Sequence, residues 1–408
     1  MVDLSQLPNP QKRAIDIVRE VAAEKRLRPF LVGGPVRDLL LGRQAIDIDL
    51  TIEEEASDLA RAVARRIDGR VKSFPQFMTY KVTAADLPEI DIATARKERY
   101  RTPGALPTVS AGKLNDDLLR RDFSINAMAC DLADGRLHDP AGGAADLGKR
   151  QIRVLHDRSF IDDPTRILRA LRFAGRLGFT LEPHTWQLLC RAIADGAFRT
   201  VSKERIWREL FLAMDERQAP EILAAAREAG VLDALFRARA DGDLLRRLQM
   251  ARSLVEGNPD LDRYALFTAM LLHGDASPVD LEGSGFSQKR ARNVMQLANE
   301  LPRFLDSLAE ARSDRQKLRI LRSASPEMLS LIAATSPPDR EMIDRFRDFE
   351  RFQLPIRGNE LEVPAGPHVS RALERTREAV FAGEIRPDEA LAHARRLAQQ
   401  YLDGKIEN

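Results

Sequence analysis

Cysteine, tryptophan and long apolar runs are scarce in this sequence. Its two cysteines, Cys130 and Cys190, lie far apart in apolar surroundings, so we expect both to fill hydrophobic cores and to form neither a disulfide nor a zinc site. The two tryptophans, Trp186 and Trp207, lie in helical apolar patterns and are expected to anchor cores. No segment reaches the roughly 18 consecutive apolar residues of a membrane span, and the N-terminal segment lacks the apolar core of a signal peptide. The sequence therefore predicts a cytoplasmic protein with no membrane partner.

A strong charge of one sign is also missing. Lysine and arginine number 64 against 62 aspartates and glutamates, so the net charge of +2 demands no nucleic-acid partner, and only a local basic surface could bind one. Hydrophobic residues make up 44% and charged residues 31%, which is typical of a folded chain and argues against disorder. At 408 residues the chain is long enough to bury two or more cores.

The six histidines are scattered and predict no zinc site. In LLHGD at 271–275, Gly274 separates His273 from Asp275, and no companion histidines follow. A metal-dependent hydrolase needs adjacent ligands and further partners, so this segment argues against one.

The residue pattern predicts an α+β fold. From residue 9 to about 95 it alternates a helix at 10–24, a strand at FLVGG, a strand at IDIDLTI (46–52), a helix at 53–67, and strands at 78–84 and 89–95. We expect a small mixed sheet with flanking helices. Residues 96–113, RKERYRTPGALPTVSAGK, predict a loop of unusual length. From 161 onward the periodicity is almost only helical.

A glycine turn opens the first candidate site. Gly33 and Gly34 end a strand, and Pro35 begins a helix whose first turn carries Arg37. Free backbone amides of Gly34 and its neighbours beside a guanidinium suit triphosphate oxygens. A tight turn without a ligand is the alternative, and from these residues alone it is favoured.

Paired carboxylates follow on the next strand. Asp47 and Asp49 are two residues apart and therefore project from one face. Two ionised carboxylates repel each other unless a cation or an arginine neutralises them, and magnesium prefers such oxygen ligands together with substrate phosphates. We expect both to be catalytic magnesium ligands. Asp91, between Ile90 and Ile92, is a candidate third catalytic carboxylate, with a solvated strand residue as the alternative.

A polar stripe is expected on a helix in DDPTRILRALRF. Asp163 and Arg166 lie three apart, and Arg169 and Arg172 continue the spacing. Cytosine and adenine place an amino donor beside a ring-nitrogen acceptor, whereas uracil and guanine place a carbonyl beside a ring N–H. A carboxylate next to a guanidinium therefore complements cytosine and adenine. A surface salt bridge is the other explanation of this spacing.

Five ordered motifs resemble one family. GGPVRDLLLG followed by DID is similar to the signature of the nucleotidyltransferase superfamily, in its branch of class II tRNA nucleotidyltransferases and bacterial poly(A) polymerases. RRDFSINAMA at 120–129 resembles the second motif, which implies that Arg121, Asp122 and Asn126 bind the incoming nucleotide and its ribose. DPAGGAADLGKRQIRVL at 139–155 resembles the third motif, a hinge between head and neck.

The last two motifs concern base choice and support. The resemblance of DDPTRILRALRF implies that Asp163 and Arg166 form an amino-acid template, with Arg169 and Arg172 meeting phosphates or holding it rigid. The chain has Asp162 where the family usually has glutamate, a departure that bears on the switch from C to A. SKERIWREL at 202–210 resembles a mainly structural fifth motif, in which Glu204, Arg205 and Glu209 brace the neck.

The resemblance also implies a domain order and an activity. It predicts a polymerase beta-like nucleotidyltransferase head at 1–140, a nucleotide-selecting neck at 141–220, a helical body at 221–340 and an RNA-binding tail at 341–408. Mg²⁺ is the expected cofactor, and the expected partners are ATP, CTP and the 3′ acceptor end of tRNA. The implied reaction adds CMP and AMP to that end.

Three alternatives stay open beside CCA addition. PGALP within 96–113 resembles A-adding and CCA-adding enzymes, whereas CC-adding relatives have a shortened loop there. Addition of the terminal A alone comes second and poly(A) tailing third. A catalytically silent RNA-binding protein is the alternative of a different class.

Overall fold

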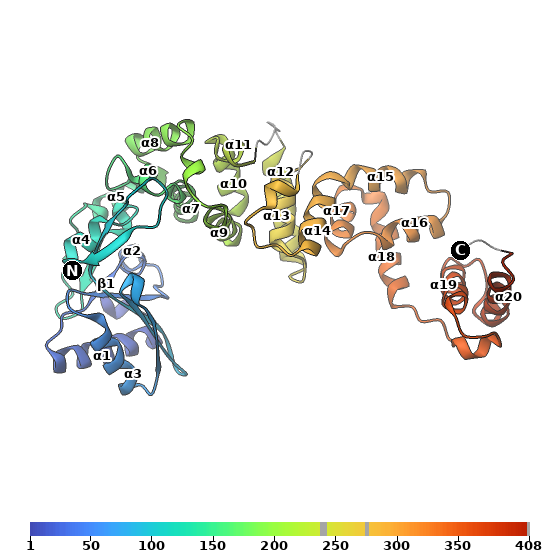
Figure 1. Cartoon of the computed structure of the whole chain (residues 1–408), viewed down its shortest axis with the longest axis horizontal. Coiled ribbons are helices and arrows are strands. Elements are labelled where there is room, and N and C mark those ends of the chain that lie inside the picture. Colours follow the sequence, from blue (N-terminus) through green and yellow to red (C-terminus); the bar gives the residue numbers. More distant parts are fainter. Residues whose placement is uncertain (237–242, 274–276, 406–408) are drawn as a thin grey trace. The chain divides into compact units, whose positions relative to one another are not determined.

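The computed structural model describes residues 1–236, 243–273 and 277–405 of the chain (Figure 1). Gly274 and Asp275 of the LLHGD segment lie outside the described residues. Contacts divide the chain into two units, Met1–Ala240 with Glu282–Gly285, and Asp241–Leu281 with Phe286–Asn408. The finer division into head, neck, body and tail stays a prediction. Within the described ranges, no helix is both long and apolar enough to cross a membrane.

The first unit contains all the described strands and the helices α1 to α11. Its strands are β1 (Phe30–Val32), β2 (Ile48–Ile52), β3 (Arg70–Phe74), β4 (Thr79–Ala84), β5 (Leu87–Thr94), β6 (Arg96–Arg99), β7 (Thr108–Ala111), β8 (Ala129–Asp131), β9 (Leu137–His138), β10 (Gln151–Ile152) and β11 (Thr180–Leu181). Its α-helices are α1 (Asn9–Lys25), α2 (Gly34–Leu40), α3 (Ala56–Arg66), α4 (Leu114–Leu119), α5 (Gly143–Lys149), α6 (Ser159–Asp162), α7 (Thr165–Leu177), α8 (Pro183–Ala194), α9 (Lys203–Asp215), α10 (Ala219–Glu228) and α11 (Val231–Phe236).

Seven of these strands form one mixed sheet in the order β3-β4-β5-β2-β1-β8-β9. β2 and β5 run parallel, with Asp49 opposite Asp91, and the other neighbours run antiparallel. Helices α1 and α3 pack on the sheet and on each other. The predicted mixed-sheet head followed by helices is confirmed, while β3, β8 and β9 were not predicted from the sequence.

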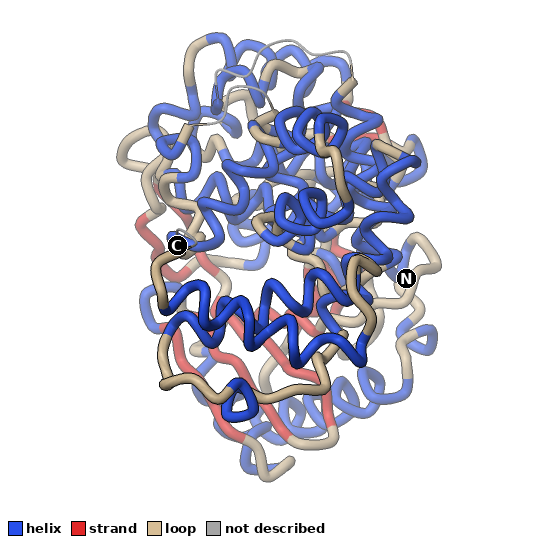
Figure 2. The backbone as a smooth tube through the Cα atoms, turned by 90° about the vertical axis from the view of Figure 1, so that its right-hand side faces the viewer, coloured by secondary structure: helices blue, strands red, loops and turns tan. Residues whose placement is uncertain are grey.

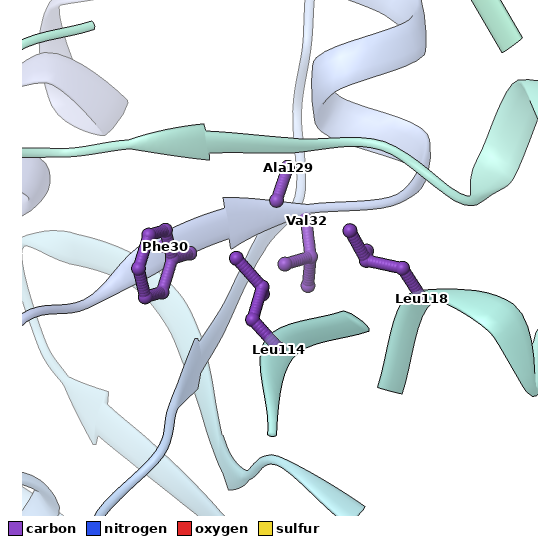
Figure 3. Packing of buried hydrophobic residues seen from close by; sticks show 5 residues of the cluster. All are labelled: Phe30, Val32, Leu114, Leu118 and Ala129. Atoms are coloured by element: carbon purple, nitrogen blue, oxygen red, sulfur yellow. The ribbon is translucent and has the colours of Figure 1, made fainter. Parts of the chain in front are cut away.

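A hydrophobic cluster ties the second motif to the centre of the sheet. Phe30 and Val32 lie two apart on β1 and pack against Leu114 and Leu118 of α4 and Ala129 of β8 (Figure 3). Their burial fixes α4 over the strand that leads into the glycine turn. The segment that follows α4 is thereby held next to that turn.

Residues 96–113 are not the loop that their composition predicted. β6 and β7 pair as an antiparallel hairpin, with Arg96 opposite Ala111 and Arg99 opposite Thr108. The charged residues of β6 are tolerated because the hairpin is a separate two-stranded sheet with solvent access, and β-branched residues favour β7. Only residues 100–107 remain as the connection.

Two expected core residues are exposed on α8. Trp186 is 41% exposed, and Cys190, four residues later on the same helical face, is also exposed. The prediction of core positions is wrong for both because this face of the amphipathic helix looks toward solvent. It is confirmed for Trp207, which is 2% exposed, and for the buried Cys130.

The second unit is helical throughout its described part. Its helices are α12 (Leu244–Gly257), α13 (Arg263–Leu271), α14 (Gln288–Asn299), α15 (Leu301–Glu310), α16 (Asp314–Arg322), α17 (Pro326–Thr335), α18 (Pro337–Arg351), α19 (Pro367–Phe381) and α20 (Ala390–Leu402). α19 and α20 pack side by side as a pair (Figure 2). Single 3₁₀ turns complete the chain at Leu4–Gln6, Pro75–Phe77, Ser124–Asn126, Ala197–Thr200, Pro278–Leu281, Gly358–Leu361 and Pro387–Glu389.

One buried carboxylate joins α16 to α19 in this unit. Glu378 is 3% exposed and accepts hydrogen bonds from Arg315 Nε at 3.0 Å, Arg319 Nη2 at 3.2 Å and Arg322 Nη1 at 3.0 Å. Three guanidinium groups thus converge on the Glu378 carboxylate. Its negative charge compensates the repulsion between the three positive charges.

Glu378→Gln is therefore expected to destabilise the second unit by about 2 kcal/mol. This is below the roughly 3–5 kcal/mol lost when a fully buried pair is broken, because the three arginines keep contact with water. Denaturant unfolding of the full chain measures the change. Glu384→Gln is the matched control, since Glu384 is exposed and pairs with Arg315 at 3.4 Å, and we expect a change within about 0.5 kcal/mol. Equal effects of the two substitutions would contradict the assignment.

Candidate active site

A cavity of about 660 Å³ in the first unit collects almost all of the predicted site residues. Its walls include Gly34, Arg37, Asp47, Asp49, Arg121, Asp122, Asn126, Asp163, Arg166, Arg169 and Arg172. Nine arginines and seven carboxylates line it, an arrangement that suits a polyanionic substrate held together with a cation. Asp91 is the one predicted site residue outside this lining.

The glycine turn has the predicted position between β1 and α2. Gly33 has a φ of +75°, and its N–H donates to the Met128 carbonyl at 3.0 Å. A Cβ at Gly33 would lie 2.4 Å from Arg121 Nη1. Arg121 itself is held by Asp117, at 3.1 Å, and by the Asn126 carbonyl, at 3.4 Å. Glycine is needed here because any side chain would displace the Arg121 guanidinium.

Gly33→Ala is accordingly expected to raise the KM for every nucleoside triphosphate by about 10-fold or more. The side chain forces Arg121 away from the cavity, and the positive φ adds strain of roughly 1–3 kcal/mol. Steady-state kinetics with each triphosphate measures the effect. Gly42→Ala is the control, because Gly42 has a φ of +65° but open space around its Cβ position. If the two variants behave alike, strain alone explains the loss and the contact with Arg121 has no role.

The paired aspartates fit a magnesium ion. Asp47 directly precedes β2, Asp49 lies on it, and both line the cavity as their spacing predicted. Burial raises the pKa of Asp49 to about 6; Arg121 opposes this shift, and Asp91 and Asp47 add to it. A carboxylate whose ionised form is this unfavourable would be stabilised by a cation. The described residues form no cluster of three or more metal-ligating side chains, so two carboxylates and substrate phosphates would complete the shell.

Asp91 lies next to Asp49, but its carboxylate contacts a lysine. The two residues are opposite each other on the parallel pair β2 and β5. Lys81 Nζ lies 3.6 Å from Asp91 Oδ1 and also pairs with Glu89. Burial raises the pKa of Asp91, while Lys81 opposes that shift. Its role as a third catalytic carboxylate stays a prediction.

A buried polar chain joins the glycine turn to the second motif. Arg37 is 3% exposed and donates to both oxygens of Asp38, at 2.9 Å each, and to Asn126 Oδ1 at 2.7 Å. Asn126 Nδ2 donates to Asp122 Oδ1 at 3.0 Å. Arg37 is therefore bound to Asp38 and Asn126, and Asn126 is bound in turn to Asp122. These hydrogen bonds fix this wall of the cavity.

Asp122 connects this chain to the third arginine of the stripe. Arg169 donates to Asp122 Oδ2 through Nε at 2.9 Å and through Nη2 at 2.6 Å. Burial alone would raise the pKa of Asp122, but the Arg169 charge and the hydrogen bonds lower it to about 2. Arg169 and Arg172 also contact Glu209 of α9, each at 3.5 Å. These contacts favour a structural role for Arg169 and Arg172, which is to hold Asp163 and Arg166 rigid, over direct contact with phosphates.

Asp163 does not lie on the helix that carries Arg166. It follows α6 and precedes Pro164, after which α7 begins at Thr165. The expectation of one continuous stripe is wrong at this residue because a residue before proline is pushed out of the helical region, and Asp163 has φ −137° and ψ 95°. Its Oδ1 caps α7 by accepting from the Thr165 N–H at 3.1 Å. No ion pair joins Asp163 to Arg166, so the salt-bridge explanation of their spacing is also excluded.

Arg166 is a buried cation whose hydrogen-bond partners are all neutral groups. It is 5% exposed and donates to Ser159 Oγ at 2.8 Å, the Arg120 carbonyl at 3.0 Å and the Tyr100 hydroxyl at 3.4 Å. Among the described residues, no carboxylate lies within ion-pair distance of it. These three contacts leave two of its five N–H groups for a ligand. Burial without a carboxylate partner is costly, so an acceptor brought by a ligand would be strongly bound.

Several cavity residues were missed from the sequence. Tyr100 and Arg120 surround Arg166, Glu98 pairs with Arg120 at 2.7 Å, and Arg205 and Arg208 reach the cavity from α9. Burial raises the pKa of Tyr100 to about 12, so its hydroxyl keeps its proton. Tyr100 and Glu98 belong to the segment 96–113, whose composition predicts a loop. The fifth motif is the one sequence signal for Arg205.

The site combines paired aspartates, a glycine turn and an arginine-rich cavity with a small mixed sheet. These features are those expected of a nucleotidyltransferase. The family model described as poly A polymerase head domain matches residues 29–153. An A-adding tRNA nucleotidyltransferase of Halalkalibacterium halodurans is 36% identical over 310 residues, which cover 74% of this chain and 73% of that protein.

Two further comparisons extend over nearly the whole chain. An A-adding tRNA nucleotidyltransferase of Geobacter sulfurreducens is 32% identical over 96% of this chain and 48% of its own length. A solved structure of a CCA-adding enzyme in an apo form matches with a TM-score of 0.84 at 25% identity, covering 98% of this chain and 97% of that one. An A-adding tRNA nucleotidyltransferase of Aquifex aeolicus is 44% identical over 56% of this chain, and the match covers 28% of that protein. The chain therefore spans less than half the length of the Aquifex aeolicus and Geobacter sulfurreducens relatives. It belongs to the family of tRNA nucleotidyltransferases and bacterial poly(A) polymerases, as its motifs predicted.

Proposed function

We propose that this chain adds CMP and AMP, from CTP and ATP, to the 3′ end of tRNA in the cytoplasm, with Mg²⁺ as cofactor and release of pyrophosphate. The observation that carries the proposal is Arg166, a buried guanidinium that lines the cavity without a carboxylate partner among the described residues. Asp163 lines the same cavity, so an acceptor and a donor are available to one ligand.

Base choice follows from the complementarity of these two groups. The Asp163 carboxylate accepts from the amino group of cytosine or adenine, and the free N–H groups of Arg166 donate to the neighbouring ring nitrogen. Uracil and guanine would place a carbonyl against the carboxylate and an N–H against the guanidinium. Each mismatch leaves buried polar groups unpaired, at a cost of roughly 1–3 kcal/mol.

Residues of the head bind the metal ion and the triphosphate of the incoming nucleotide. Asp47 and Asp49 would hold Mg²⁺, which when bound favours loss of the proton from the RNA 3′ hydroxyl and neutralises the pyrophosphate. Gly34 and Arg121 bind the triphosphate. The RNA 3′ oxygen forms a bond to the α-phosphorus, the bond to the bridging oxygen breaks, and pyrophosphate leaves. The helical second unit would hold the tRNA acceptor end through its backbone phosphates.

A specific observation favours a second candidate, addition of the terminal A alone. The Halalkalibacterium halodurans and Geobacter sulfurreducens relatives are both named A-adding enzymes. Asp163 and Arg166 complement cytosine and adenine alike, so the cavity residues do not separate the two activities. Poly(A) tailing remains the third candidate within the same family.

Three tRNA substrates distinguish these activities. They lack the last three, two or one residues of the CCA end and are each incubated with CTP, with ATP, or with both. CCA addition completes all three tRNAs. Addition of A alone extends only the tRNA that lacks its last residue, and poly(A) tailing adds further adenylates to each. No extension of any substrate would refute nucleotide transfer to tRNA.

A further inference from the structure

Arg205 connects the hairpin to the carboxylate expected to read the base. It lies in the first turn of α9, where Nη2 donates to Asp163 Oδ1 at 2.8 Å and Nη1 donates to the Gly104 carbonyl at 2.8 Å. One planar guanidinium therefore spans two segments far apart in sequence. The planarity of the fork fixes the direction of both hydrogen bonds.

The carbonyl end of this bridge is itself immobilised. The Gly104 N–H donates to the Asp162 carbonyl at 3.1 Å. A Cβ at Gly104 would lie 2.2 Å from the Thr200 carbonyl oxygen, so the backbones are packed as closely as glycine allows. The hydrogen bond to this rigid Gly104 carbonyl fixes the Arg205 guanidinium, which in turn fixes the Asp163 carboxylate.

The two oxygens of Asp163 are used differently. Oδ1 accepts from the Thr165 N–H at 3.1 Å, from the Thr165 hydroxyl at 2.7 Å and from Arg205. Within the described residues, Oδ2 accepts no hydrogen bond. Because rotation of a carboxylate exchanges its oxygens, three donors on Oδ1 also determine where Oδ2 lies.

We propose that Arg205 is a positioning residue for nucleotide selection, which orients Asp163 so that Oδ2 accepts the amino group of cytosine or adenine. The inference rests on the proposed function and deepens it. Arg205 touches neither base nor phosphate in this role and acts through Asp163. In this proposal, the fifth motif contributes to nucleotide selection through Arg205, in addition to supporting the neck.

The test is a kinetic profile of all four nucleoside triphosphates on tRNA. Arg205→Ala is expected to lower the preference, in kcat/KM, for CTP and ATP over UTP and GTP by about 10-fold, the effect of losing one charge-assisted hydrogen bond of about 1.4 kcal/mol. Arg205→Lys should recover part of the preference, since lysine keeps the charge and one donor. Arg208→Ala is the matched control: Arg208 lies one turn further on α9 and lines the same cavity. We expect it to change the four nucleotides in equal proportion.

A double-mutant cycle separates positioning from general damage. If Arg205 acts through Asp163, then Arg205→Ala causes no further loss of preference in the Asp163→Ala background. An equal loss in both backgrounds, or a uniform decrease for all four nucleotides with Arg205→Ala, would overturn the inference. Should Arg205→Ala fail to fold, Arg205→Lys in both backgrounds provides the same comparison. A wild-type chain that transfers no nucleotide to tRNA refutes the proposed function itself. If the wild type and Arg205→Ala prefer CTP and ATP to the same degree, only the inference about Arg205 is refuted.

Discussion

Asp49→Asn is expected to lower nucleotide transfer by at least about a thousandfold while leaving RNA binding near the wild-type level. The amide keeps the shape of the side chain but lacks the charge needed to hold Mg²⁺, and a thousandfold corresponds to about 4 kcal/mol of transition-state stabilisation. Asp47→Asn should have a comparable effect because its carboxylate lines the same cavity and its charge acts on Asp49. Single-turnover transfer and tRNA binding, measured side by side, separate the two quantities.

The neighbouring strand offers a control for the loss of charge. Glu89 lies on β5, is exposed, and pairs with Lys81 rather than with the cavity. Glu89→Gln should therefore transfer nucleotides nearly as fast as the wild type. Near-wild-type turnover in a variant carrying both Asp47→Asn and Asp49→Asn would refute the magnesium site.

Asp163→Ala should slow CTP and ATP and relax discrimination against UTP and GTP. The change leaves the amino group of the favoured bases without its acceptor, at a cost of roughly 1–3 kcal/mol, and removes the repulsion that rejects a carbonyl. We expect the preference for CTP and ATP over the other two nucleotides to fall by about 10- to 100-fold in kcat/KM. The same four-nucleotide profile on tRNA measures it.

Asp157→Ala provides the matched comparison for this prediction. Asp157 lies in the same segment, but its side chain is 76% exposed and pairs with His184. It should keep the wild-type preference. Equal reduction of all four nucleotides by Asp163→Ala would mean that Asp163 only caps α7 and that another group selects the base.

Local signals in the sequence predicted most of the head and the composition of the cavity. The spacing of Asp47 and Asp49 was sufficient because strand geometry alone puts both on one face. Spacing alone fails at Asp163, because helical periodicity does not continue across Pro164, which excludes the preceding residue from the helix. The hairpin at 96–113 was missed because charge, proline and glycine outweighed the β-branched residues of its second strand.

The partners of Asp163 and Arg166, the proposed base-reading residues, could not be predicted in this way. Arg166 meets Tyr100 and the Arg120 carbonyl from 66 and 46 residues away, and Asp163 meets Arg205 from 42 residues away. Such pairings depend on how the hairpin and α9 pack around α7. Periodicity within one element carries no information about them.

Sequencing the products that form when all four nucleoside triphosphates compete tests the central claim most directly. The substrate is an equal mixture of tRNAs that lack the last three, two and one residues, incubated with the wild-type chain and Mg²⁺. Extension only by C and A, ending at or before the completed CCA sequence, is the predicted result. Incorporation of U or G at rates similar to C and A, or no extension of any of the three tRNAs, would contradict it.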